Sequence, residues 1–145
     1  MRLSRYTDIG LRALLYVGTR DRRVSAREVS DAFNVSRDHV TKSLQGLVAL
    51  GALTSTPGRS GGFTLRRDPR EIRLGQIIRD LEPSLALAEC FTPDSTCPMT
   101  SSCELASALY QARAAFFDSL DRYSIADLIE KDRPALVQLS YAQAS

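Results

Sequence analysis

Three cysteines, Cys90, Cys97 and Cys103, are the residues of this chain whose type and spacing most clearly suggest chemistry, and the chain has no others. They are separated by six and five residues in a segment rich in Pro and Ser, so their thiolates can turn toward one soft centre, such as zinc or an iron–sulfur cluster. An odd number excludes a fully paired set of disulfides within the chain. Reduced cysteine is often simply buried, but residues 91–102 offer little apolar material for that. The pattern therefore favours metal ligands.

The rest of the sequence argues against an enzyme. It shows no Ser-His-Asp set, no paired acid–base carboxylates and no nucleotide loop, which disfavours a small redox protein with a catalytic or electron-transfer cluster. A structural zinc site in a DNA-binding protein without cluster sensing stays open as an alternative. Zinc sites of this kind usually include a fourth Cys or His nearby, and the segment around the cysteines has none.

Length and charge divide the chain into two unlike parts. The 145 residues allow one domain, or a small head with an appendage. Residues 1–80 hold 15 Lys and Arg against 8 Asp and Glu, a net charge of +7, whereas residues 81–145 hold 4 against 9, a net charge of −5. The first part is therefore a candidate polyanion binder, although a merely solvated basic face would show the same charge.

No targeting or membrane segment is expected. No apolar signal stretch opens the chain, and the longest apolar run, residues 47–53 with Gly51 inside it, is too short to cross a bilayer. The sequence therefore predicts a cytoplasmic protein without a membrane partner. In that reducing compartment, clustered cysteines more often serve metals or redox chemistry than disulfides.

The basic part carries a helix-turn-helix pattern. Ser25, followed by Glu28, is a capping-box signature and predicts the start of a short second helix. Ser36 is expected to cap a third helix, which Gly51 ends. A first helix that ends near Gly18 is predicted from apolar residues at helical spacing, namely Leu3, Tyr6, Gly10, Ala13, Leu14 and Val17.

If the third helix enters a major groove, its outward residues near the start include the base readers. These candidates are Ser36, Arg37, Asp38, His39, Thr41, Lys42 and Gln45. Arg37, His39 and Lys42 are the residues we expect to contact DNA most directly. For His39, the only histidine, a local role at the helix start or a contact with phosphate alone stays open.

Behind the third helix, the segments Leu53–Thr56 and Phe63–Leu65 are predicted to form a β-hairpin joined by the glycine-rich residues 57–62. After a helix-turn-helix, such a hairpin is a candidate wing. Arg59 and Ser60 at its tip would then reach a minor groove or a phosphate. An ordinary glycine-rich hairpin is the alternative.

The acidic part contains two further helix patterns. Apolar positions predict a helix over Leu74–Leu81, ended by Pro83, and a long amphipathic helix from Leu105 to Tyr123. Residues 124–130 are expected to form a last short helix, and residues 131–145 a loose tail. The predicted fold is mainly α with a small β-hairpin wing, divided into a winged helix-turn-helix head (1–82), a cluster-binding loop (83–103), and a dimerisation helix with a C-terminal tail (104–145).

A long exposed helix needs a partner, and a second copy of the chain is the economical one. Twofold-related heads would match two half-sites on successive turns of DNA, about 34 Å apart. The alternative is that this helix packs against its own head.

The chain resembles the Rrf2 family of winged-helix regulators and, within it, the NsrR-like nitric-oxide-sensitive repressors. The resemblance extends through about Glu130 and is carried by residues 1–8 (MRLSRYTD), 36–42 (SRDHVTK), 58–65 (GRSGGFTL), Glu89-Cys90-Phe91, Cys97-Pro98 and Cys103. It implies a homodimeric transcriptional repressor that binds operator DNA and holds an iron–sulfur cluster through the three cysteines. Attack on that cluster by nitric oxide would end repression.

An iron–sulfur cluster usually takes four protein ligands, and each chain supplies three thiolates. IscR-like relatives carry a histidine shortly after the third cysteine, whereas here Ala106 and Ser107 occupy that region. The resemblance to NsrR-like proteins assigns the fourth position to Asp8, supplied by the other subunit. A routine surface ion pair with Arg12 is the alternative role of Asp8. The other carboxylates within reach of the loop are Glu89, Asp94 and Glu104.

Two properties of such a site stay open in the sequence. A [4Fe-4S] cluster is favoured because a carboxylate-capped site with three cysteines resembles that arrangement, while a [2Fe-2S] cluster is the alternative. The same scaffold could also sense iron supply, cluster status or oxygen instead of nitric oxide.

Overall fold

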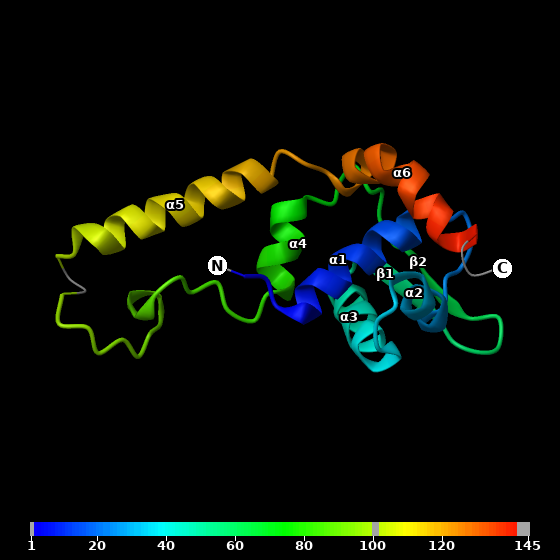
Figure 1. Cartoon of the computed structure of the whole chain (residues 1–145), viewed down its shortest axis with the longest axis horizontal. Coiled ribbons are helices and arrows are strands. Elements are labelled where there is room, and N and C mark those ends of the chain that lie inside the picture. The colour runs from blue at the N-terminus through cyan, green and yellow to red at the C-terminus, as the bar shows by residue number, and fades with distance from the viewer. Residues whose placement is uncertain (1, 100–101, 142–145) are drawn as a thin grey trace.

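The computed structural model describes residues 2–99 and 102–141. Figure 1 shows a head at one end of the molecule and a long helix, α5, that extends away from it beside an irregular loop. The helices are α1 (Arg5–Gly18), α2 (Ala26–Phe33), α3 (Arg37–Ala49), α4 (Leu74–Leu81), the short 3₁₀ helix η1 (Glu89–Phe91), α5 (Glu104–Leu120) and α6 (Ile125–Tyr141). The strands are β1 (Leu53–Thr56) and β2 (Gly62–Leu65). The prediction of a mainly α fold with a β-hairpin wing is confirmed.

Helix α1 is the central element of the head. Its first turn is capped by Ser4, whose hydroxyl oxygen accepts a hydrogen bond from the Thr7 N–H at 3.2 Å. Its apolar side faces α3, the hairpin and α6, as the predicted helical spacing requires. The start of α1 is also tied to the end of α4, because the Ser4 N–H donates to the Glu82 carboxylate at 2.9 Å. The fully buried side chains of the head include Leu14, Tyr16, Val29, Leu44, Leu53, Ile72 and Ile125.

The turn between α2 and α3 follows the predicted pattern with two local differences. Ser25 caps α2 by accepting from the Glu28 N–H at 3.1 Å, but the reciprocal half of the capping box does not form. The Glu28 carboxylate instead accepts from the Tyr16 hydroxyl at 3.1 Å and from the Arg22 guanidinium at 2.7 Å. These bonds lower the pKa of Glu28, with Arg22 the largest cause. Ser36 occupies the N-cap position of α3, although its side chain makes no capping hydrogen bond within the described residues.

Helix α3 ends where the sequence predicts. Gly51 adopts a φ of +72°, and the Ala52 N–H turns back to the Leu47 carbonyl at 3.0 Å. Strand β1 follows at once and pairs antiparallel with β2, so that Leu53 faces Leu65 and Thr56 faces Gly62. Strand β2 therefore begins one residue earlier than predicted. A bridge between Val24 and Phe63 fastens the hairpin to the segment before α2.

Gly62 combines a strained backbone with a close neighbour, because its φ is +146° and a Cβ there would lie 2.7 Å from the Val24 carbonyl oxygen. We expect Gly62→Ala to lower the free energy of unfolding by about 2–4 kcal/mol, from backbone strain and steric overlap together. Gly58→Ala is the matched control: Gly58 also has a positive φ, +100°, but a Cβ there would have no atom within 4 Å. Chemical denaturation of both variants measures the free energy of unfolding. An equal loss in the two variants would contradict the close packing of Gly62 against Val24.

The C-terminal helix α6 is longer than predicted. Residues 131–141 continue the helix, so the predicted loose tail is wrong for this segment; residues 142–145 lie outside the described residues. Leu136 is buried, its carbonyl oxygen accepts from the Arg20 guanidinium at 3.1 Å, and Leu139 packs against the core of the head. Tertiary packing therefore carries the helix past Pro134, whose missing N–H would otherwise weaken it.

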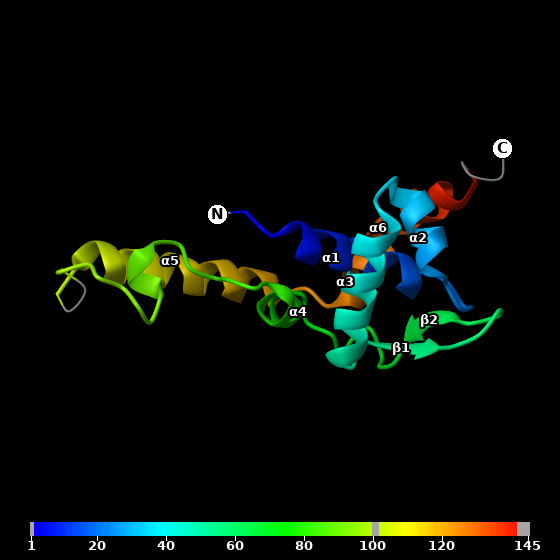
Figure 2. The same cartoon turned by 90° about the horizontal axis from the view of Figure 1, so that it is seen from below.

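Helix α5 differs from the others because most of its surface faces solvent (Figures 1 and 2). It ends at Leu120, three residues before the predicted end, and its contact with the head is through α4. Ala106 and Phe117 are its buried residues, whereas Leu105 is 67% exposed and Leu109 and Phe116 are partly exposed. No helix among the described residues is long and apolar enough to span a membrane.

Candidate nucleic-acid interface and metal-binding loop

The face of α3 that points away from α1 carries the predicted DNA-reading residues. Val40, Leu44 and Leu47 are buried against the head, and the Ser43 hydroxyl donates to the Tyr6 carbonyl at 2.9 Å. These contacts fix the rotation of α3 about its own axis. The opposite face is therefore polar and open to solvent.

On this face, Ser36, Arg37, His39 and Lys42 are exposed. Thr41 is half-buried, and its hydroxyl donates to the Arg37 carbonyl at 2.8 Å, so it is already used within the helix. Arg59 and Ser60 are exposed in the turn of the hairpin. Within the described residues, no ion pair neutralises Arg37, Lys42 or Arg59. These cations are accordingly available to a polyanion.

The three cysteines lie on the loop between α4 and α5. Cys90 is in η1, Cys97 is in the irregular segment after it, and Cys103 occupies the N-cap position of α5. All three are partly buried, and no disulfide joins them. Among the described residues, no three Cys, His, Asp or Glu side chains converge into a group that could hold a metal ion. The loop thus gathers the three thiols in one region without bringing them to a common centre.

The loop has some internal order of its own. The Glu89 carboxylate accepts hydrogen bonds from the Thr96 N–H and from the Thr96 hydroxyl, both at 2.8 Å. These bonds lower the pKa of Glu89. Glu89, a candidate fourth ligand, is therefore used in closing the segment between Cys90 and Cys97.

The donor set fits an iron–sulfur cluster by its chemistry. Three free thiols on one loop supply three of the four ligands that such clusters usually take, and none of them belongs to the core of the head. Cys103 lies at the start of a 17-residue helix, which fixes its position at one end of α5.

Asp8 is in the first turn of α1 and forms the ion pair that the alternative interpretation predicts. Its carboxylate accepts two hydrogen bonds from the Arg12 guanidinium, at 2.7 and 3.1 Å, and both side chains are close to half exposed. Figures 1 and 2 place the cysteine loop along α5, away from the start of α1. Within one chain, therefore, Asp8 is not part of the cysteine loop.

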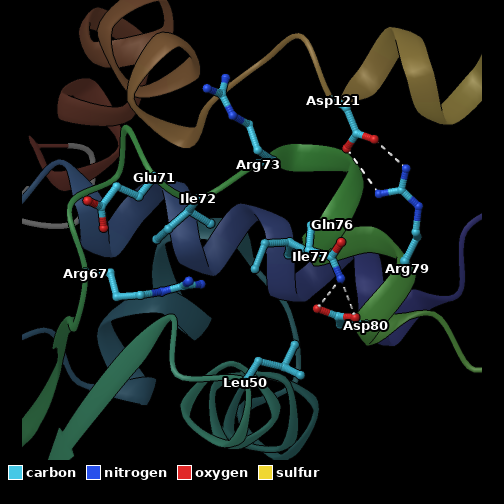
Figure 3. A pocket seen from close by; sticks show the side chains of 10 residues that line it. All are labelled: Leu50, Arg67, Glu71, Ile72, Arg73, Gln76, Ile77, Arg79, Asp80 and Asp121. Carbon is cyan, nitrogen blue, oxygen red and sulfur yellow. Dashed lines mark hydrogen bonds and ion pairs between the residues drawn. The ribbon is translucent and has the colours of Figure 1, made fainter.

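A hollow at the junction of α3, α4 and α5 shows how the long helix is fixed to the head (Figure 3). Arg79 of α4 makes a two-bond ion pair with Asp121, the residue that follows α5, and its guanidinium lies 4.5 Å from the Phe117 ring centroid. The hydrogen bonds from Arg79 lower the pKa of Asp121. The absence of a side chain at Gly75 permits this contact, because a Cβ there would lie 2.2 Å from the Asp121 carboxylate. Sequence reasoning missed the pair, whose members are 42 residues apart.

Sequence reasoning also missed residues of α5 that hold the cysteine loop. The Tyr110 hydroxyl donates to the Cys90 carbonyl at 3.0 Å, and the Arg113 guanidinium donates to the Leu85 carbonyl at 3.3 Å. Their spacing of three residues could have shown that they share a face of the helix. Nothing in the sequence indicates that this face meets the loop.

Comparison with known proteins agrees with this architecture. The family model described as "Rrf2: Iron-dependent Transcriptional regulator" matches residues 3–131. The chain is 36% identical over 143 residues to the HTH-type transcriptional regulator NsrR of Shouchella clausii, an alignment that covers 95% of this chain and 96% of that relative.

Solved structures confirm the fold. T. potens IscR aligns with a TM-score of 0.72 at 23% identity, over 93% of this chain and 90% of that chain. CymR, the global cysteine regulator of B. subtilis, aligns with a TM-score of 0.70 at 22% identity, over 90% and 98% of the respective chains. Family model, NsrR-like sequence and winged-helix architecture agree: the chain belongs to the Rrf2 family and is a transcriptional regulator, not an enzyme.

Proposed function

We propose that this chain is a cytoplasmic, homodimeric repressor whose binding to operator DNA is controlled by an iron–sulfur cluster that reacts with nitric oxide. The observation that carries the proposal is the set of three reduced, partly buried thiols on one loop outside the head. Nitric oxide is proposed as the signal because the chain is 36% identical to a protein named NsrR.

The residues that would hold the cluster are Cys90, Cys97 and Cys103, with Asp8 of the partner subunit at the fourth position. When bound, the cluster would supply iron that nitric oxide can attack. A carboxylate oxygen binds iron less firmly than a thiolate does, so the Asp8 position is the one we expect to exchange most readily. The Asp8–Arg12 ion pair holds that carboxylate at the surface of the head, where another chain can reach it.

Dimerisation would use the exposed side of α5. Leu105, Leu109, Ala112 and Phe116 follow one another at spacings of four, three and four residues, and all are exposed or partly exposed. The buried residues Ala106 and Phe117 lie on the neighbouring stripe, which serves contacts within the chain. A second copy packed on the exposed stripe would pair two heads for the half-sites of one operator.

DNA binding by the exposed cations predicts a steep dependence on salt. Each lost phosphate contact should make the slope of log affinity against log salt concentration shallower by about 0.9. Between 1 M and 0.1 M salt, the affinity of the variant should therefore rise roughly eightfold less than that of the wild type. We expect this for Arg59→Ala and for Lys42→Ala. Arg133→Ala is the matched control, because Arg133 is also exposed but lies on α6, across α1 from α3 (Figure 1). Fluorescence anisotropy at several salt concentrations measures the slope, and a flat response would contradict the proposed interface.

Anaerobic purification tests the proposed cofactor and signal together. We expect brown protein containing iron and sulfide, a native mass that identifies [4Fe-4S] rather than [2Fe-2S], and loss of operator binding as nitric oxide is added. A colourless zinc protein would contradict the cluster. Operator release by oxygen or by iron removal, with nitric oxide inert, would contradict the proposed signal and favour the alternative sensors. Protein without iron and sulfide that still binds and releases its operator normally would overturn the proposal.

A further inference from the structure

The cysteine loop is fastened to α5 by stacked side chains. Phe91, next to Cys90, stacks on Tyr110 of α5 with the ring centroids 4.2 Å apart and the ring planes at 26°. The Tyr110 hydroxyl donates to the carbonyl of Cys90 at 3.0 Å. Both contacts act on η1, the turn that carries the first cysteine. The backbone position of Cys90 is therefore set by α5.

Arg113 completes the stack, one helical turn after Tyr110. Its guanidinium carbon lies 4.5 Å from the Phe91 ring centroid and 5.3 Å from the Tyr110 ring centroid. The same guanidinium donates to the Leu85 carbonyl at 3.3 Å, near the beginning of the loop. Arg113 is the only basic residue between Arg79 and Arg122. The single cation of this acidic stretch is thus used to hold the loop against the helix.

We propose that Phe91, Tyr110 and Arg113 form a clamp that positions Cys90 for metal binding, an inference that rests on the proposed function. They are positioning residues, because they act on the backbone around Cys90 and none of them would bind the cluster. Cys103 is already fixed as the N-cap residue of α5. The clamp therefore attaches the first and the third ligand to the same helix, although the two lie 13 positions apart in the chain.

This arrangement holds two of the three candidate ligands, Cys90 and Cys103, on α5. The Thr96 N–H and hydroxyl both donate to the Glu89 carboxylate, and these bonds close the part of the loop between Cys90 and Cys97. Assembly of the ligand set would then bring Cys97 together with two cysteines whose backbone α5 already holds. Ordering two ligands beforehand lowers the entropy cost of binding.

Alkylation of the three thiols in the apo protein tests the clamp without any cluster. We expect Tyr110→Phe, which removes only the hydroxyl, to raise the iodoacetamide reaction rate of Cys90 about fivefold, the factor for one net hydrogen bond. The rates of Cys97 and Cys103 should change less than twofold. Phe91→Leu, which removes the stacked ring, should act in the same direction. Mass spectrometry of the digested protein reports each thiol separately.

Tyr123→Phe is the matched control, because Tyr123 is similarly exposed but lies beyond α5, where its ring faces Lys131. Equal Cys90 rates in Tyr110→Phe and Tyr123→Phe would overturn the clamp.

A second measurement on loaded protein separates the clamp from the proposed function. Tyr110→Phe should lose iron to excess chelator about fivefold faster than Tyr123→Phe, as followed by the visible absorbance. Faster alkylation of Cys90 with unchanged iron loss would overturn the role of the clamp in metal binding. A chain that takes up no cluster at all refutes the proposed function instead, and the apo alkylation rates still decide whether the clamp holds Cys90.

Discussion

Cys97→Ala is expected to leave a folded protein that holds no iron–sulfur cluster. Cys97 lies on the irregular part of the loop, outside the core of the head, so the free energy of unfolding of the apo protein should change by less than about 0.5 kcal/mol. Two remaining thiolates and one carboxylate cannot complete a set of four ligands. The brown colour and the iron content should fall to near zero, and operator affinity should equal that of the apo protein with or without nitric oxide.

Ser102→Ala is the matched control for this experiment. It makes a change of similar size on the same loop, one residue before Cys103, at an exposed position. Iron and sulfide analysis, the visible spectrum and operator binding are measured on both variants after anaerobic purification. Full iron content in Cys97→Ala, or an unchanged response to nitric oxide, would mean that the three cysteines are not the sensor.

The head could be predicted from the sequence because its signals are local. The apolar spacing of α1, the Ser25 cap of α2 and the positive φ of Gly51 after α3 each depend on residues within a few positions of one another. The same signals fix which face of α3 is buried. The residues of α3 predicted to contact DNA do lie on its exposed face, with half-buried Thr41 as the exception, and their contact with DNA stays a prediction.

The extent of α6 could not be predicted in this way, although apolar residues continue at helical spacing through Leu136 and Leu139. Pro134 interrupts the backbone hydrogen bonds and suggests an end to the helix. Two contacts with residues distant in sequence outweigh the effect of Pro134. Helix α6 packs closely on α1, since a Cβ at Gly18 would lie 2.3 Å from Ile129, and the Arg20 guanidinium donates to the Leu136 carbonyl. Propensity was overridden by tertiary contact.

The candidate site was only partly predictable for the same reason. The cysteines are visible by type and spacing, but their supports come from α5, and the tie between α5 and the head is the Arg79–Asp121 pair. From α4, contact passes directly to α3, the predicted DNA-reading helix, because Leu81 lies beside Gly10 of α1 and Gly46 of α3. Within one chain, then, continuous contacts connect the cysteine loop with α3. Such continuity supports a mechanical link, and the variants at Cys97 and Asp8 test whether it is used.

Asp8→Ala is expected to change the cluster and its response to nitric oxide with little effect on stability. The Asp8–Arg12 pair is close to half exposed at both ends and spans one helical turn, so it contributes no more than about 0.3–0.5 kcal/mol after solvent screening. Loss of a ligand from the partner subunit would have a much larger consequence. The visible spectrum of the anaerobic protein should shift, and operator binding should lose its dependence on nitric oxide.

Arg12→Ala separates the two roles of Asp8, because it breaks the same ion pair and leaves the carboxylate in place. If Asp8 is a ligand, Arg12→Ala keeps the spectrum and the nitric-oxide response, whereas Asp8→Ala loses both. Asp8→Cys should restore a stable cluster and slow its reaction with nitric oxide, since a thiolate binds iron more firmly than a carboxylate. Identical behaviour of Asp8→Ala and Arg12→Ala would show that Asp8 is only one member of a surface ion pair. Asp94 and Glu104 would then be the candidates for the fourth ligand. They are the carboxylates on or next to the cysteine loop that accept no hydrogen bond from Thr96.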